Sequence, residues 1–110
     1  MNAILSIKPI YTHSILSGKK KVEFRKASFK REVRKIYIYS SSPDQRIIGY
    51  FLVKEIISDK PKNLWNKYNE VGYFILIDKV FRFKNPINPN TVFDNFTPPQ
   101  SFCYCEDIES

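Results

Sequence analysis

Glycine and cysteine are scarce in this chain, and long apolar runs are missing from it. Three glycines and two cysteines among 110 residues argue against a collagen-like repeat, low-complexity disorder and a disulfide-stapled secreted scaffold. The chain has no run of about 18 apolar residues, so no transmembrane helix is predicted. The N-terminus lacks the basic start and apolar stretch of a secretory signal. We therefore expect one cytoplasmic domain over residues 1–110, with no membrane partner.

Motifs for cofactors and for common catalytic devices are also missing. The chain has no glycine-rich phosphate loop, no His-Glu-x-x-His and no serine nucleophile elbow. His13 has no metal-ligand companion at helical spacing, and Cys103-x-Cys105 supplies only half of a zinc site. Without a Cys-x-x-Cys at a helix start, we interpret the two cysteines as core or edge thiols. The sequence thus predicts no metal site and no cofactor.

Positive charge is in excess, and it is concentrated in one stretch. Eighteen Lys and Arg against eleven Asp and Glu give a net charge of +7. Between Lys19 and Lys35 there are nine basic residues and two acids, Glu23 and Glu32, so this stretch carries the whole net charge. Such a field favours a polyanionic partner, nucleic acid first and an anionic membrane surface second. A solvated lysine-rich face has the same composition.

Alternating and near-continuous apolar segments predict a mostly β fold. The expected strands are Ala3–Lys8, Lys21–Lys26, Val33–Tyr39, Ile47–Ile57, Val71–Phe83 and Gln100–Cys105. The expected helical segments are Pro9–Ser17 and a turn or two over Pro61–Tyr68 with Trp65 as an anchor, and Asn85–Pro99 reads as a loop. Strands of 11–13 residues are long and bend readily around a small core. We expect a mostly β (α+β) fold with short helices, a small mixed β-barrel of about five to six strands.

The strongest local signal is Gly18-Lys-Lys-Lys-Val-Glu-Phe-Arg25. Gly18 ends a helix whose buried face is expected at Tyr11 and Ile15, and Lys20 lies in the turn that follows. Strand alternation then puts Glu23 and Arg25 on one polar face. A carboxylate beside two cations accepts a hydrogen bond or orients a water, and an arginine grips a phosphate or stacks on a base. A surface ladder of salt bridges without any function explains the spacing equally well.

Five motifs follow one another over nearly the whole chain. They are Leu5-Ser-Ile-Lys-Pro9, Gly18-x-Lys20-x-x-Glu23-x-Arg25, Lys35-Ile-Tyr-Ile-Tyr-Ser-Ser-Ser-Pro43, Ile48-Gly-Tyr-Phe51 and Pro98-Pro-Gln-Ser-Phe102. In these the sequence resembles the ASCH domain family, which belongs to the PUA-like superfamily of small β-barrels. The resemblance implies a cleft facing RNA or DNA between the first helix, the Glu-x-Arg strand and the neighbouring loops. Relatives are RNA-binding modules, coactivator-associated domains and predicted transcriptional regulators, and a few are ribonucleases or amidohydrolases of acetylated cytidine.

The amidohydrolase relatives use a lysine, a threonine and a glutamate. By resemblance Lys20 matches the lysine, but Glu23 stands where those enzymes have the threonine. The second glutamate has no secure counterpart, and Glu70 is a guess from its place before a late strand. These departures argue against that particular activity.

Our leading hypothesis is a nucleic-acid-binding ASCH module in RNA metabolism or transcriptional regulation, with RNA or another single-stranded nucleic acid as partner. The expected binding residues are Lys8, Lys19, Lys20, Lys21, Glu23, Arg25, Lys26, Lys30, Arg31, Lys35, Ser41, Ser42, Gln100 and Ser101. The candidates for base stacking are Tyr37, Tyr39, Tyr50, Tyr73 and Tyr104. The alternative is a hydrolase of RNA or of a modified nucleoside, with Lys20 and Glu23 as the catalytic pair. A third hypothesis is a protein-interaction domain whose basic face binds an acidic partner, and the oligomeric state stays open.

Overall fold

Six segments rich in β-branched and aromatic residues form one sheet in the computed structural model, which describes residues 1–26, 29–57, 72–100 and 102–108. The strands are β1 (Asn2–Ile7), β2 (Val22–Arg25), β3 (Lys35–Ser40), β4 (Arg46–Ile57), β5 (Tyr73–Ile87) and β6 (Phe102–Cys105). The helices are α1 (Pro9–Leu16) and the 3₁₀ turn η1 (Pro89–Thr91). The predicted fold class, mostly β with short helical segments, is confirmed.

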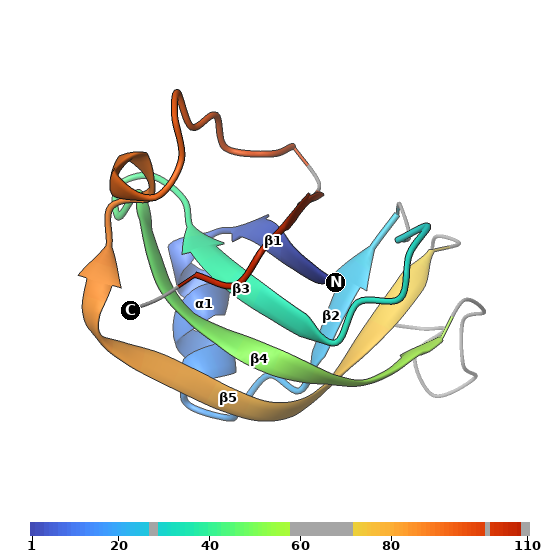
Figure 1. Ribbon diagram of the computed structural model, residues 1–110. Coiled ribbons are helices and arrows are strands. Elements are labelled where there is room, and N and C mark those ends of the chain that lie inside the picture. Colours follow the sequence, from blue (N-terminus) through green and yellow to red (C-terminus); the bar gives the residue numbers. More distant parts are fainter. Residues whose placement is uncertain (27–28, 58–71, 101, 109–110) are drawn as a thin grey trace.

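The sheet is curled, and its strand order is β2-β5-β4-β3-β1-β6. Strand β1 runs parallel to β3, so the chain between them must cross over, and α1 and β2 lie in that crossover. The long antiparallel pair β4 and β5 bends strongly and forms much of the curl (Figure 1), and β-bulges interrupt its register. The curvature expected of a barrel is present, but in the described residues it takes the form of a half-barrel whose edge strands are β2 and β6.

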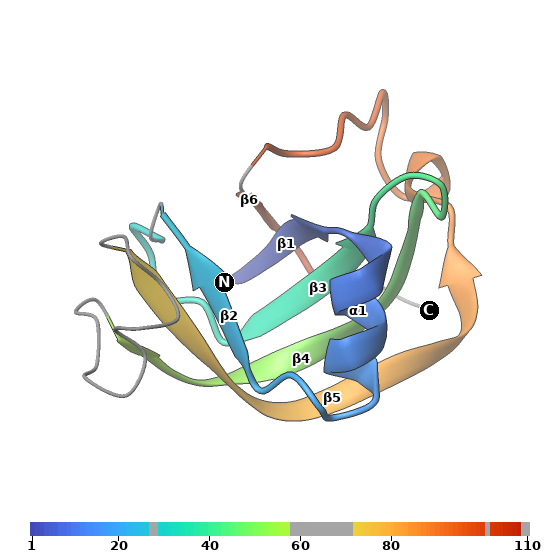
Figure 2. The same cartoon turned by 180° about the vertical axis from the view of Figure 1, so that it is seen from behind.

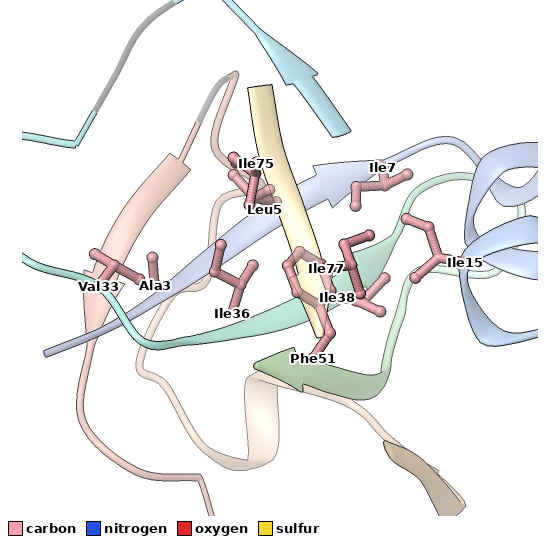
Figure 3. Packing of buried hydrophobic residues seen from close by; sticks show 10 residues of the cluster. All are labelled: Ala3, Leu5, Ile7, Ile15, Val33, Ile36, Ile38, Phe51, Ile75 and Ile77. Atoms are coloured by element: carbon pink, nitrogen blue, oxygen red, sulfur yellow. The ribbon is translucent and has the colours of Figure 1, made fainter. Parts of the chain in front are cut away.

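The inner face of the curl holds the main core. Aliphatic side chains from β1, β3 and β5, with Val33 just before β3, meet Phe51 of β4 and Ile15 of α1 there (Figure 3). On the outer face a second cluster forms around Ile4, Tyr37 and Phe83, and the chain after β5 covers part of it. Strand β1 is therefore buried on both faces, whereas its alternation predicted a half-buried strand.

Helix α1 lies across the inner side of the sheet, opposite the C-terminal segment (Figures 1 and 2). Its predicted extent is confirmed, but its buried face differs from the prediction. Thr12 is fully buried, whereas Tyr11 is 49% exposed. The Thr12 hydroxyl donates to the Pro9 carbonyl at 2.8 Å and lies 3.1 Å from the Ser40 hydroxyl. Because both partners satisfy it, this polar residue is buried without an unpaired hydroxyl.

The end of β5 differs from the prediction. Strand β5 continues to Ile87, and η1 follows it, so the expected loop over Asn85–Pro99 is shorter than the sequence indicated. The helical turn expected over Pro61–Tyr68 lies outside the described residues. Of the described helices, none has the length and apolar character that crossing a bilayer requires.

Gly49 tests how tightly β4 and β5 pack. A Cβ at this position would collide with the carbonyl oxygen of Phe81, whereas Gly18 has open space around it but a φ of 81°. We expect Gly49→Ala to lower the free energy of unfolding by about 3 kcal/mol or more, because a paired backbone oxygen cannot move aside. Gly18→Ala should cost only about 1 kcal/mol, the cost of a left-handed backbone. Urea unfolding of both variants measures the difference, and equal losses would contradict the tight β4–β5 contact.

Candidate functional site

Lys20, Glu23 and Arg25 converge on the inner side of the half-barrel. Glu23 is directly opposite Ile75 of β5, a core residue of the inner face, so its carboxylate points inward. Its Oε2 lies 2.9 Å from Nη2 of Arg25, and its Oε1 lies 3.4 Å from Nζ of Lys20. The polar face that the alternation of β2 predicted is thus an inner face, and Glu23 is buried in it.

Arg25 also joins two strands that have no ladder between them. Its Nη2 donates to the carbonyl of Ser6 in β1 at 3.0 Å. That carbonyl lies past the paired stretch of β1 and β6, which ends at Leu5. The guanidinium therefore bridges β2 and β1 across the open side of the curl. Its Nε is buried and has no hydrogen-bond partner within the described residues.

The turn after α1 places Lys20 beside this pair. The backbone N–H of Gly18 donates to the Ile15 carbonyl and that of Lys20 to the Ser14 carbonyl, at 3.1 and 2.9 Å. The glycine occupies the left-handed region that ends the helix. The Lys20 ammonium then lies 5.5 Å from the ring centroid of Tyr11. Tyr11 was expected in the core but is a neighbour of this site. The burial of Thr12, which the sequence did not indicate, turns Tyr11 toward Lys20.

The cluster is suited to an anionic oxygen. The side chains of Lys20 and Arg25 remain 19% and 16% exposed, so a ligand can reach them from the open side. An ammonium has three N–H donors and a guanidinium has five, more than Glu23 and Ser6 use. The two cations therefore keep donors for a phosphate, and the carboxylate beside them is able to accept a proton.

The other predicted basic residues do not form one patch. Lys19, Lys21 and Lys26 are exposed next to β2, and Lys8 is exposed at the start of α1. Lys35 lies on the outer face, where its Nζ is 4.8 Å from the Tyr50 ring centroid and 3.4 Å from Asp107 Oδ1. The stretch that carries the net charge is therefore divided between the two faces of the sheet.

Lys30 and Arg31 lie against the far edge strand. Their backbone N–H groups donate to the Tyr104 hydroxyl at 2.8 and 3.2 Å, and the Arg31 guanidinium carbon is 5.5 Å from the Tyr104 ring centroid. Phe29 packs on Phe102 of the same strand, with ring centroids 4.5 Å apart. These contacts hold the segment after β2 against β6, and they leave Lys30 and Arg31 exposed.

The remaining predicted site residues lie elsewhere. Ser42 and Gln100 are exposed, and the backbone of Ser41 donates to the Ile7 carbonyl at 2.9 Å. Ser101 lies outside the described residues, as does Glu70. The structure therefore brings Lys20, Glu23 and Arg25 together, and within the described residues no hydrogen bond or ion pair joins them to Ser41, Ser42 or Gln100.

The predicted stacking tyrosines are mostly committed to the fold. Tyr37 and Tyr39 are buried in the outer cluster, and the Tyr37 hydroxyl accepts from the Ile108 N–H at 2.8 Å. Tyr104 uses its hydroxyl to hold the segment after β2. Tyr50 is half-buried and stacks on Phe81 at 4.7 Å. Buried rings cannot stack on a base, so Tyr37 and Tyr39 are not available for binding.

The two cysteines share the outer face of β6. Burial raises the pKa of Cys103, and burial together with the neighbouring Cys103 raises the pKa of Cys105 to about 12. Both thiols are therefore protonated near neutral pH, which disfavours metal binding and nucleophilic attack. Among the residues that the structure describes, no group of three or more His, Cys, Asp or Glu side chains is placed to hold a metal.

Two ion pairs of equal length test whether the buried cluster holds the half-barrel closed. Arg25–Glu23 and Arg34–Glu32 both measure 2.9 Å, but the side chains of the first pair are 16% and 9% exposed and those of the second 82% and 75%. We expect Arg25→Ala to lower the free energy of unfolding by about 3 kcal/mol, since it leaves a buried carboxylate short of a partner. Arg34→Ala should cost at most about 0.5 kcal/mol. Chemical unfolding gives both values, and a small loss at Arg25 would contradict the bridge.

Comparison with known proteins agrees with the fold. The profile of the ASCH domain matches residues 5–102. A curated relative from Zymomonas mobilis subsp. mobilis, an ASCH domain-containing ribonuclease, is 28% identical over 128 aligned positions, with 98% of this chain and 86% of the relative covered. The crystal structure of ASCH from Zymomonas mobilis aligns with a TM-score of 0.82 at 25% identity, covering 96% of this chain and 87% of that one. A tyrosine-to-phenylalanine variant of that protein aligns equally well, with a TM-score of 0.82 at 25% identity over 96% and 90% of the two chains. Since the profile spans nearly the whole chain, this protein belongs to the ASCH domain family.

Proposed function

We propose that this domain binds single-stranded RNA at the Lys20–Glu23–Arg25 cluster and cleaves it there. The observation that carries the proposal is the buried carboxylate that holds two partly accessible cations in fixed positions. A phosphodiester presents an anionic oxygen to such cations, and its cleavage needs a proton acceptor beside them. The ribonuclease from Zymomonas mobilis, a relative of this chain, supports RNA as the substrate class.

The chemistry fits an attack by the ribose 2′ hydroxyl on the adjacent phosphorus. The bond from the 2′ oxygen to phosphorus forms while the bond from phosphorus to the 5′ oxygen breaks, which leaves a 2′,3′-cyclic phosphate and a 5′ hydroxyl. Glu23 accepts the proton of the 2′ hydroxyl, and the Lys20 ammonium donates a proton to the departing 5′ oxygen. Arg25 hydrogen-bonds a non-bridging oxygen, where negative charge grows in the transition state.

The buried position of Glu23 favours the hydrolase hypothesis over a purely binding module. A general electrostatic footprint needs exposed cations, but Glu23 is buried and engages two of them. Lys19, Lys21 and Lys26 remain exposed next to β2 and provide the long-range attraction to the RNA backbone. The long-range attraction and the catalysis are then assigned to different lysines.

Variants of neighbouring lysines separate these roles. We expect Lys20→Ala and Glu23→Gln to lower the cleavage rate by roughly 10²–10⁴-fold, because each removes a proton-transfer group. Lys19→Ala is the matched control. It removes the same charge at the adjacent residue, which is exposed. It should weaken binding slightly and leave the rate at saturating RNA unchanged. The assay is incubation with an RNA pool and mass spectrometry of the new ends, with 2′-deoxy substrate as the negative control.

Three outcomes would contradict this proposal. Salt-sensitive RNA binding without any cleavage would restore the binding module as the function. Turnover of acylated cytidine nucleosides with intact RNA would point to an amidohydrolase. Equal loss of cleavage in Lys19→Ala and Lys20→Ala would show that charge alone, and not the position of Lys20, matters.

The salt response tests the RNA contact independently of cleavage. A site that neutralises about four to six phosphates on a single strand should give a slope of about −3 to −4 for the logarithm of the binding constant against that of the salt concentration. The net charge of +7 motivates this range. Fluorescence anisotropy with Glu23→Gln and labelled RNA measures the slope without cleavage, and a flat response would exclude the phosphate backbone as the main contact.

A further inference from the structure

A hollow of about 300 Å³ lies beside His13 of α1, whereas the Lys20 cluster lies beside Tyr11 of the same helix. His13 of α1, Arg46 at the start of β4 and Arg82 near the end of β5 line it together. Lys20, Glu23 and Arg25 do not line it, and of the residues in the five sequence motifs only Ile48 does. Its volume is at the lower end of the range for small-molecule sites.

A chain of hydrogen bonds connects two walls of this hollow. The hydroxyl of Thr12 lies 3.1 Å from that of Ser40, which donates to Oδ2 of Asp44 at 2.8 Å. His13 follows Thr12 directly, and Asp44 and Arg46 lie in and after the turn that leaves β3. These hydrogen bonds connect α1 to that turn, so the side chains of His13 and Arg46 extend from rigid backbone.

A β-bulge forms the third wall. Ile47 of β4 pairs with Ile87 of β5, but Gly49, only two residues later, pairs with Arg82. The extra residues of β5 bulge out opposite Ile48, which lines the hollow together with Phe83. Bulges of this kind re-aim side chains and are frequent next to binding sites. Here the bulge brings the Arg82 guanidinium and an apolar surface to the same hollow.

The lining combines the donors that a phosphate takes with an apolar wall. Arg46 uses Nη1 on the Gln45 carbonyl at 2.9 Å and keeps its other donors. Within the described part of the chain, neither Arg82 nor His13 forms an ion pair. Two guanidinium groups and an imidazole N–H suit a phosphate, because planar N–H forks match its oxygens. The hollow therefore offers unused donors at a place where the fold is rigid.

Asp44 argues against a bare anion as the ligand of this hollow. Its carboxylate also lines the hollow and would repel a phosphate placed against it. One of its oxygens is engaged by Ser40, so the other remains to accept a hydrogen bond. Ribose hydroxyls and the amino groups of bases are such donors, and Ile48 and Phe83 give a base an apolar surface. We propose that this hollow is a nucleotide site, with Arg46, Arg82 and His13 on the phosphate and Asp44 on the ribose or base.

The nucleotide is either a free mononucleotide or one residue of an RNA strand, and only the second case rests on the proposed function. The two cases share the same phosphate chemistry. A strand that occupies this hollow and also reaches the Lys20 cluster would have to pass α1, which lies beside both.

The experiment titrates the ¹⁵N-labelled protein with 5′-AMP, with inorganic phosphate and with a short 2′-O-methyl RNA, which lacks the hydroxyl needed for cleavage. We expect the Nε–H signals of Arg46 and Arg82 to shift with 5′-AMP. Arg82→Ala should weaken binding of 5′-AMP by at least about tenfold, as expected for the loss of hydrogen bonds to a charged group. Lys84→Ala is the matched control, because it removes the same charge from an exposed position on the same strand that does not line the hollow. It should change the affinity less than about twofold.

The other titrations show whether the nucleotide is free or part of an RNA strand, and they distinguish failure of this site from failure of the proposed function. A 2′-O-methyl RNA that binds much more tightly than 5′-AMP, and loses affinity in Arg82→Ala, identifies a strand, whereas equal affinities identify a free nucleotide. Equal binding of phosphate and 5′-AMP would overturn the nucleotide assignment, and equal effects of Arg82→Ala and Lys84→Ala would overturn the site. Glu23→Gln should leave 5′-AMP binding intact, so absence of RNA cleavage would count against the proposed function and not against this site.

Discussion

The bridge from Arg25 to Glu23 and to the Ser6 carbonyl is the interaction on which the half-barrel depends. The curled sheet has no ladder between β2 and β1 in the described residues, so its open side is held by side chains instead of backbone pairs. A buried ion pair adds little net stability, since desolvation offsets much of its attraction, but it is strongly directional. It therefore fixes where β2 lies relative to β1 more than it strengthens the fold.

The same bridge makes the candidate site. Glu23 lies against both Arg25 and Lys20, and these two cations are partly exposed on the open side. The residues that hold the open side are thus the same ones to which we assign the proposed chemistry. A second set of contacts joins the segment after β2 to the other edge strand, β6. Phe29 packs on Phe102, and the backbone N–H of Lys30 donates to the Tyr104 hydroxyl. These contacts leave the inner cluster accessible.

Helix α1 contributes residues both to the Lys20 cluster and to the hollow lined by Arg46 and Arg82. The turn after its last residue presents Lys20 beside Tyr11, and His13 lines the hollow at the end of β5. The buried Thr12 hydroxyl, bonded to Pro9 and in contact with Ser40, sets the rotation of the helix about its axis. A small polar side chain in the core, and not an apolar stripe, therefore decides which residues face each surface.

Local pattern alone determined the strands, the helix from Pro9, the glycine stop and the grouping of Lys20 with Glu23 and Arg25, because each depends on spacing within one or two elements. The phase of α1 was not predictable, since the partner that lets Thr12 be buried is Ser40, 28 residues away. Spacing also could not tell that Glu23 points inward, because alternation names two faces without saying which is buried. Only the tertiary structure divided the basic stretch between two faces and brought His13, Arg46 and Arg82 to one hollow, since the crossover and the β-bulge that do so join strands distant in sequence.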